Sequence, residues 1–189
     1  MQENHDIGMN IVRVFGARRC HKSRFYEDAL CDRGVAYILR DVEEDEDATA
    51  ELRLLYADGG LKFPTLLIRG KRVRNPTLRD LDRQLAHAGL YDPGVVHEPR
   101  AQRFVRFMAP QDAFVSYSET TNQIVLSHIE VPAQKRGSGL GAKLALEVFP
   151  MVKAIGKTAR VTCPFLRTIA ASNAEWANYF NIAATNERS

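Results

Sequence analysis

A glycine-rich run in the second half of the chain has the composition of an anion-binding turn. Residues 134–144 read Gln-Lys-Arg-Gly-Ser-Gly-Leu-Gly-Ala-Lys-Leu, between an apolar alternating run, 124–131, and an apolar helical run, 144–149. A strand-to-helix turn exposes the backbone N–H groups of the first helical turn, and glycine lets an anion approach them closely. Three cations add positive charge: Lys135, Arg136 and Lys143. We therefore predict that this turn holds a phosphate group.

A cysteine marks the predicted junction between the first strand and the first helix. Cys20 follows the loop 16–19 and opens the segment Cys20-His-Lys-Ser23. At such a junction the sulfur faces unpaired N–H groups, which lowers the pKa of the thiol and favours the thiolate. Arg18 and Arg19 are expected to act in the same direction. This position suits thiol–disulfide exchange.

The cysteine count does not indicate a disulfide framework. There are three cysteines, Cys20, Cys31 and Cys163, and the polar N-terminus does not resemble a signal peptide. Cys20 and Cys31 are eleven positions apart on one predicted helix, or about 16 Å, which exceeds the roughly 7 Å that a disulfide allows. We interpret Cys31 as a small core residue.

Composition excludes several classes of protein. Of the 189 residues, 45% are hydrophobic and 26% are charged, as in a globular protein. The net charge of +3 is too small to indicate nucleic-acid binding, and no apolar run approaches the roughly 18 residues of a membrane span. We expect a cytoplasmic protein with no nucleic-acid partner, no membrane partner and no metal site.

The hydrophobic pattern predicts an α/β protein with two domains. In the first half it favours the order β-α-β-α-β-β-α, with two parallel strands joined by a helix and a final hairpin. The expected strands and helices are 11–15, 20–33, 35–39, 48–56, 65–68, 72–74 and 77–88. On the first helix, Phe25, Ala29 and Leu30 are expected to share the buried side.

The second half favours strands at 103–108, 113–118, 123–131 and 159–163, and helices at 142–154, 165–171 and 175–180. Between the halves, the turn residues Gly89-Leu-Tyr-Asp-Pro-Gly94 begin a linker that continues through Val95-Val-His-Glu-Pro99. We place one domain at residues 9–90, the linker at 91–98 and the second domain at 99–183.

Residues 9–90 resemble a monothiol glutaredoxin of the thioredoxin-fold superfamily, close to the mycoredoxin-like branch. The resemblance rests on Cys20-His-Lys-Ser23 and on Phe63-Pro64-Thr65, which stands where that family has its cis-proline turn. It implies that Cys20 is the nucleophile, that cis-Pro64 faces it, and that a low-molecular-weight thiol such as glutathione or mycothiol is the partner. Ser23 replaces a resolving cysteine, Phe63 replaces the usual valine, and Arg74-Asn-Pro-Thr replaces the segment that anchors glutathione.

Residues 98–182 resemble the minimal branch of the GNAT acetyltransferases. Gln134, Gly137 and Gly139 fit the signature Q/R-x-x-G-x-G/A, preceded by His128-x-Glu-Val-Pro132 and followed by Cys163-Pro-Phe165. The resemblance implies that acetyl-CoA binds through its pyrophosphate, with pantetheine between the strands 124–131 and 159–163. The implied pyrophosphate-binding residues are Gln134, Lys135, Arg136, Gly137, Ser138, Gly139, Leu140, Gly141 and Ala142.

The implied reaction is attack of an amine on the thioester, with a base to take its proton. Glu130 and His128 are both candidates for this base, because alternate residues of a strand point the same way. The resemblance also places Cys163 close to the acetyl group, where a transient acetyl-cysteine can form. The alternatives are a hydrogen-bonded structural His128 and a buried Cys163. Ile169 stands where the branch has a tyrosine, which removes a possible acid.

Three functions follow from these resemblances. The first is a CoA-binding domain that acetylates an amine of a small molecule or a protein, fused to a thiol domain. The second is a thiol–disulfide oxidoreductase acting through Cys20, whose other domain only binds CoA or a protein partner. The third is a redox-sensitive CoA-binding protein without catalysis.

Overall fold

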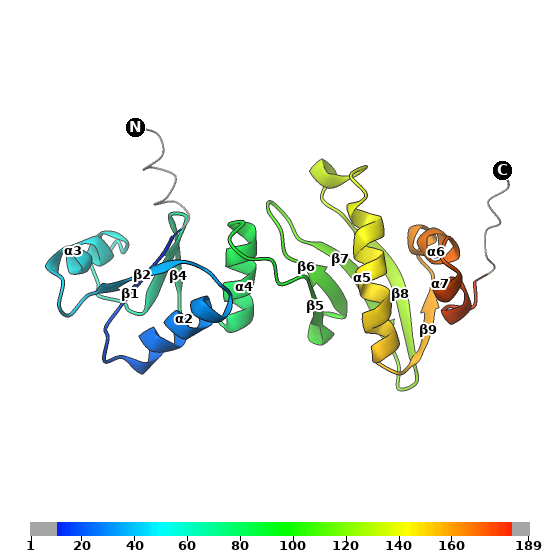
Figure 1. Cartoon of the computed structure of the whole chain (residues 1–189), viewed down its shortest axis with the longest axis horizontal. Helices are drawn as coiled ribbons and strands as arrows, with labels where there is room; N and C mark the ends of the chain where they lie inside the picture. Colours follow the sequence, from blue (N-terminus) through cyan, green and yellow to red (C-terminus); the bar gives the residue numbers. More distant parts are fainter. Residues whose placement is uncertain (1–10, 183–189) are drawn as a thin grey trace. The chain divides into compact units, whose positions relative to one another are not determined.

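The computed structural model describes residues 11–182, which divide into two compact units between Asp92 and Pro93 (Figure 1). The division separates two sheets, each with its own helices and its own core. Both units are α/β.

The first unit contains a four-stranded sheet with the strand order β2-β1-β3-β4. Strands β1 and β2 are parallel and β3 and β4 form a hairpin, as the sequence predicted. Strand β3 also pairs antiparallel with β1, which the sequence did not predict. Its elements are β1 (Val12–Gly16), α2 (His21–Asp32), β2 (Tyr37–Asp41), α3 (Glu46–Leu54), β3 (Thr65–Ile68), β4 (Lys71–Arg74) and α4 (Leu78–His87).

Alternating side chains of the central strands divide the core of this unit into two layers. Val12 and Val14 of β1 pack with α2 and α4, whereas Phe15 packs with α3 on the other face of the sheet. Leu66 of β3, which pairs with Val14, lies in the first layer, and its neighbour Leu67 lies in the second. The sheet is therefore covered on both faces, and the thiol junction lies at the end of its central strand.

Helix α2 buries Ala29 and Leu30 as predicted, but the rest of its buried stripe differs from the prediction. Cys20 is its N-cap residue, and its buried residues are Ser23, Tyr26, Ala29 and Leu30. Phe25 is 47% exposed and Cys31 is exposed, so the prediction of core positions for these two was wrong. The spacing of three and four residues that starts at Ser23 sets the buried face, and a polar residue at its start hid this pattern.

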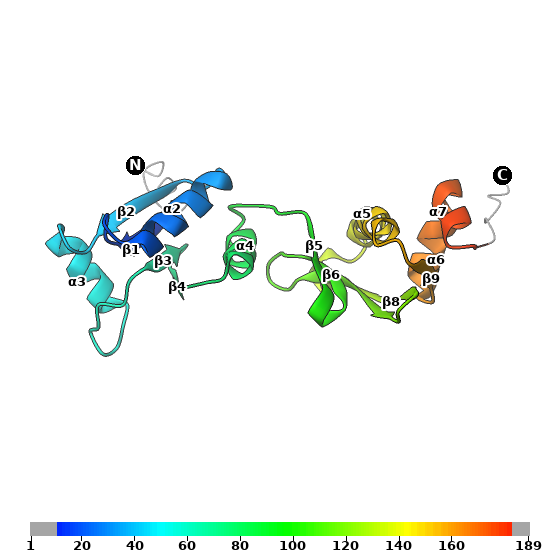
Figure 2. The same ribbon diagram turned by 90° about the horizontal axis from the view of Figure 1, so that it is seen from below.

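The second unit contains a five-stranded sheet with the strand order β5-β6-β7-β8-β9. The first four strands are antiparallel, and β9 pairs parallel with β8 after the crossover through α5. Helix α5 crosses one face of this sheet (Figure 2), and its residues Leu144, Val148 and Phe149 belong to the core. The elements are β5 (Val95–Glu98), η1 (Pro99–Ala101), β6 (Arg103–Arg106), β7 (Ala113–Glu119), β8 (Gln123–Glu130), η2 (Ala133–Lys135), α5 (Leu140–Ala154), β9 (Thr158–Val161), α6 (Pro164–Ala171) and α7 (Ala174–Tyr179).

Strand β5 occupies residues that the sequence assigned to the linker. It pairs antiparallel with β6, and His97 stacks on Phe104 with ring centroids 4.4 Å apart while its Nε2 lies 2.8 Å from the hydroxyl of Tyr117. Burial lowers the pKa of His97, as expected for an imidazole that takes part in packing. The linker prediction was wrong at Val95–Glu98 because four residues after a Pro-Gly turn are too few to show a strand pattern.

Candidate functional site

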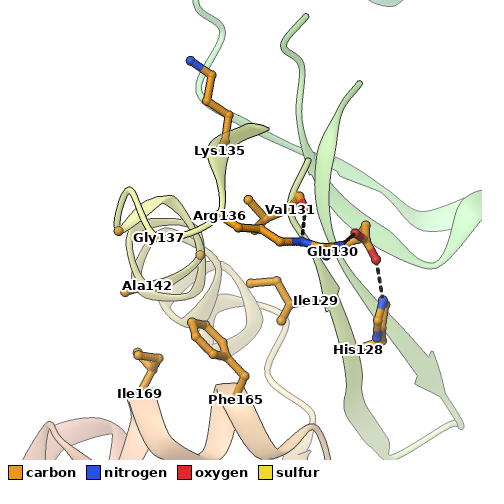
Figure 3. Close-up of a pocket in the computed structure, with 12 residues that line it drawn as sticks. His128, Ile129, Glu130, Val131, Lys135, Arg136, Gly137, Ala142, Phe165 and Ile169 are labelled. Atoms are coloured by element: carbon orange, nitrogen blue, oxygen red, sulfur yellow. Dashed lines mark hydrogen bonds and ion pairs between the residues drawn. The ribbon is translucent and has the colours of Figure 1, made fainter. Parts of the chain in front are cut away.

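The glycine-rich turn joins β8 to α5 through a backbone that only glycine adopts readily. After η2, Gly137 and Gly139 have φ angles of +79° and +82°, in the left-handed region, and α5 begins at Leu140 (Figure 3). Gly139 is the N-cap residue, and no side chain caps this helix terminus. The start of α5 is therefore open to an external acceptor.

The N–H groups of this turn are not equally available. The N–H groups of Lys135, Arg136 and Ser138 donate to carbonyl oxygens within the turn. The first α-helical bond of α5 is from the N–H of Lys143 to the carbonyl of Gly139, so the preceding N–H groups have no intrahelical acceptor. Of residues 135–142, those that offer an N–H to an anion are Gly137, Gly139, Leu140, Gly141 and Ala142.

Beside the turn, strands β8 and β9 separate. Their pairing ends at Leu126 and Val161, followed by bonds from the N–H groups of Thr162 and Cys163 to the carbonyl of Leu126. Beyond Leu126, β8 continues to Glu130 without β9 beside it. A cavity of about 590 Å³ lies at this separation, lined by His128, Ile129, Glu130, Val131, Lys135, Arg136, Gly137, Gly139, Gly141, Ala142, Phe165 and Ile169.

A β-bulge in β8 turns His128 and Glu130 away from the core. Tyr117 of β7 pairs with Leu126, and the preceding Ser116 pairs with His128, so Ser127 is an extra residue. Leu126 is buried and Ile129 packs against the core, whereas His128 and Glu130 share the opposite face (Figure 3). The sequence predicted that these two point the same way, but not that a bulge decides which way.

The carboxylate of Glu130 binds two side chains of the cavity. Its Oε1 accepts from Nη2 of Arg136 at 2.9 Å, and its Oε2 lies 3.3 Å from Nε2 of His128. Arg136 also donates from Nε to the carbonyl of Val131 at 3.2 Å. The guanidinium of Arg136, and then the imidazole of His128, lower the pKa of Glu130. The sequence identified all three residues but gave no sign of this contact.

Close packing on one side of the cavity requires a glycine. A Cβ at Gly141 would lie 3.1 Å from Cζ of Phe165, so the ring of Phe165 lies directly against the backbone of α5. Phe165 and Ile169 come from α6, and both line the cavity with apolar surface. This arrangement explains the phenylalanine of the Cys163-Pro-Phe165 motif.

The structure does not bring every predicted residue to this cavity. Cys163 is 8% exposed and belongs to the core. It continues the alternation in which the side chains of Ala159 and Val161 point into the core. Ser138 and Leu140 instead border a second cavity of about 440 Å³ on the other side of the turn, with Lys135 and Lys143. Gln134 is exposed and lines neither cavity.

The thiol of Cys20 lies at the N-terminus of α2, which no side chain caps. The pKa of Cys20 is lowered, first by hydrogen bonding to the N–H of Ser23 and then by the Ser23 hydroxyl, the N–H of Lys22 and the charge of Lys22. The helix start therefore stabilises the thiolate, as predicted. Arg19 instead binds Glu43 with bonds of 2.6 and 2.7 Å, and Arg18 lies 3.8 Å from Asp41.

Ser23 is fixed beneath the thiol. It is 0% exposed, its hydroxyl accepts from the N–H of Ala17 at 3.1 Å, and a Cβ at Gly16 would lie 2.3 Å from that hydroxyl oxygen. The serine of the Cys20-His-Lys-Ser23 segment therefore belongs to the support of the loop. The Phe63–Pro64 peptide bond is cis, as the resemblance implied.

Residues 11–182 contain neither a membrane-spanning helix nor a cluster of metal ligands. No helix there has both the length and the apolar composition to cross a membrane. In the same residues, no group of three or more His, Cys, Asp and Glu side chains is arranged to hold a metal ion.

Comparisons with known proteins match each unit separately. Residues 12–73 match the glutaredoxin family model, and residues 103–179 match the model described as GCN5-related N-acetyl-transferase. Among solved structures, a mutant of a thioredoxin-like protein is 28% identical over 39% of this chain and 92% of its own, with a TM-score of 0.34. No curated protein matches the chain. Both predicted resemblances are thereby confirmed.

Proposed function

Because the chain joins a glutaredoxin domain to a GNAT-type acetyltransferase domain, we propose that its second unit binds acetyl-CoA and transfers the acetyl group to a primary amine. The observation that carries this proposal is the uncapped glycine turn of α5, which opens on the cavity where β8 and β9 separate. A ligand with an anionic group at the turn and an extended chain along β8 has the two parts of CoA, a pyrophosphate and a pantetheine arm.

The residues present fit this donor. The N–H groups of Gly137, Gly139 and the first turn of α5 would hold the pyrophosphate, and the cations Lys135 and Lys143 border the same turn. The backbone of β8 beyond Leu126 has no β9 beside it, so its polar groups can bind the amide groups of pantetheine. When bound, acetyl-CoA supplies an acetyl group activated as a thioester.

The acceptor would be an amine of a small molecule or of a protein. A base on β8 must take its proton, and His128 and Glu130 are the titratable groups of β8 that line the cavity. Cys163 lies in the core instead, so we propose direct transfer without an acetyl-cysteine.

Calorimetric titration of the full chain with CoA tests the binding step. We expect saturable binding that Gly137→Asp abolishes, because the substitution strains a left-handed backbone position and places a carboxylate beside the phosphates. Gly156→Asp is the matched control, since Gly156 has a φ of +77° in the turn that precedes β9. Absence of binding by the native protein would overturn the proposal.

Transfer is tested separately by mass spectrometry, with acetyl-CoA and two acceptors, spermidine and a lysine-containing peptide. We expect a mass increase of one acetyl group on at least one acceptor. Binding without transfer to any amine would favour the reading in which this unit only binds CoA.

A second candidate function is thiol–disulfide exchange through Cys20. The lowered pKa of Cys20 at the start of α2 favours it, and the partner would be a low-molecular-weight thiol such as glutathione or mycothiol. Reduction of a mixed disulfide by the native protein tests this function. Equal rates with and without the protein would remove it.

A further inference from the structure

Three polar side chains at the mouth of the CoA-site cavity form one connected group. The carboxylate of Glu130 accepts from Arg136 through Oε1 and contacts Nε2 of His128 through Oε2, while Arg136 is also anchored on the carbonyl of Val131 (Figure 3). The glycine turn that would hold the donor is thus tied to the two titratable residues of β8.

This contact assigns the hydrogen of the imidazole. An ionised carboxylate can only accept, so Nε2 of His128 carries the hydrogen and Nδ1 carries the lone pair. Within residues 11–182, Nδ1 has no hydrogen-bond partner, and the side chain is 56% exposed. His128 therefore presents a free basic nitrogen to solvent beside the cavity.

Glu130 is poorly suited to the same task. Both of its oxygens are engaged, and Arg136 holds its pKa below the usual range, so it stays ionised and binds a proton weakly. A carboxylate in this state can instead stabilise an imidazolium and fix the orientation of the ring, as in other carboxylate–histidine pairs.

We propose that His128 is the catalytic base of acetyl transfer, and that Glu130 and Arg136 are positioning residues that act through it. The inference rests on the proposed function. The amine nitrogen forms the new C–N bond while the C–S bond of the thioester breaks, and the sulfur keeps the electron pair. One N–H proton passes from the amine to Nδ1 and then to the departing thiolate, so no other reactant is needed.

The neighbours of His128 leave Glu130 as its one bonded carboxylate within the described residues. From β7, Ser116 pairs with it in the sheet, and the ring of Phe114 lies 6.4 Å from its own. The guanidinium of Arg103 in β6 lies 5.4 Å from the centre of the Phe114 ring, and Arg136 faces Glu130 from the glycine turn. Glu130 is thus the group through which His128 is linked to Arg136.

The bulge at Ser127 supplies the geometry that the proposal needs. It turns His128 and Glu130 to one face of β8, while Ile129 lines the cavity from the other face. A base on one face and apolar contacts on the other allow the amine and the donor to approach from different sides.

Nitrogen-15 NMR of the histidines tests the assignment without any turnover. In the native protein we expect His128 to be in the Nε2–H tautomer, identified by the resonance that disappears in His128→Gln. Glu130→Ala should weaken this preference. A dominant Nδ1–H tautomer in the native protein would overturn the proposal.

Kinetics with the best amine acceptor tests the role. His128→Gln should lower kcat/KM by about a hundredfold near neutral pH without changing CoA affinity, and the loss should shrink at a pH where the amine is unprotonated. Glu130→Ala should cost less, because the ring loses the carboxylate that orients it but keeps Nδ1. Ser118→Ala, which removes an exposed hydroxyl from β7, should behave as the native protein.

The outcomes separate the two claims. If His128→Gln keeps the native rate and profile, or if Glu130→Ala loses more activity than His128→Gln, the assignment of the base is wrong while the proposed function stands. If the native protein binds CoA and acetylates no amine, the proposed function fails, and the role of His128 fails with it.

Discussion

The two candidate sites are both built at the start of a helix that follows a strand, and neither helix has a side-chain cap. Helix α2 begins after Cys20 and α5 after Gly139, and neither has an acidic residue in its first turn. Helices α3, α4 and α7 differ, because Asp45, Thr77 and Asn173 cap them. Omitting a cap costs about 1 kcal/mol of stability, and it leaves the N–H groups available for another anion.

The two sites use the free N–H groups of their helix starts differently. At α2 the anion belongs to the chain, since the thiolate of Cys20 is the N-cap residue itself, supported by the fully buried Ser23. At α5 the N-cap is a glycine without a side chain, and the residues of the preceding turn are exposed. The anionic group of the first site is therefore part of the chain, whereas the N–H groups of the second remain available to a ligand.

The largest expected effect distinguishes the thiol site at α2 from the acetyl-transfer site at α5. Cys20→Ser should reduce thiol exchange to the uncatalysed background, because a serine hydroxyl is not ionised at neutral pH, and should leave acetyl transfer intact. Alkylation by iodoacetamide and the mixed-disulfide assay measure the first effect. Cys31→Ser is the control and should retain exchange; loss of exchange in that variant instead would place the reactive thiol at the other end of α2.

Removing the support of the thiol should produce the next largest effect. Ser23→Ala leaves the buried N–H of Ala17 without its acceptor, which should lower the free energy of unfolding by about 1–3 kcal/mol. It also removes a hydrogen bond that lowers the pKa of Cys20, so the midpoint of alkylation against pH should rise. In the native protein that midpoint should lie below that of an unfolded cysteine.

Urea unfolding and pH-dependent alkylation measure these two changes. Ser118→Ala, an exposed serine of the second unit, is the control. An alkylation midpoint that Ser23→Ala leaves in place would contradict the claim that this serine supports the thiolate.

A smaller effect tests the turn at α5. Gly141→Ala adds a Cβ 3.1 Å from Phe165, so the ring must move by a few tenths of an ångström and narrow the cavity. We expect CoA affinity to fall by about fivefold, or ~1 kcal/mol. Displacing the ring should destabilise the fold, but alanine favours the helix over glycine by about 1 kcal/mol. The two effects oppose each other, so the melting temperature should change little. Unchanged affinity with a lowered melting temperature would mean that Phe165 lies outside the CoA site.

The smallest effect concerns the thiol at the other end of α2. Cys31 lies 3.8 Å from the hydroxyl of Tyr37, and this contact raises the pKa of Tyr37 to about 12. Cys31→Ala should bring the tyrosine titration back toward its ordinary value of about 10, measured by ultraviolet absorbance. Comparison with Tyr37→Phe identifies the part of the absorbance change that comes from Tyr37. Identical titrations of the native and Cys31→Ala proteins would contradict the claim that Cys31 raises the pKa of Tyr37.

The sequence predicted the order of elements in the first unit, the order from β6 onward in the second, and the two strand-to-helix junctions, because these depend on local patterns. It did not predict what depends on contacts between strands. Strand β5 became visible only through its pairing with β6, and the exposure of Phe25 followed from the position of Ser23 under Gly16. Cys163 fits its motif, yet the phase of β9 places it in the core.

Likewise, the motif identified His128 and Glu130 as site residues, but their orientation depends on an unpaired Ser127 that no pattern revealed. The uncapped helix starts were visible in the sequence. Neither α2 nor α5 begins with the Ser, Thr, Asp or Asn residues that usually open a helix. The sites themselves were identified from the glycine run with its cations and from Cys20 at a strand-to-helix junction.

The bulge of β8 has a consequence for how this protein can vary among descendants. Because Tyr117 pairs with Leu126 and Ser116 with His128, deleting the codon of Ser127 would let His128 follow Leu126 in regular alternation. His128 and Glu130 would keep their face of β8, and every residue of the cavity would still be encoded. Lineages of such a domain can therefore lose this one codon without turning the motif residues over.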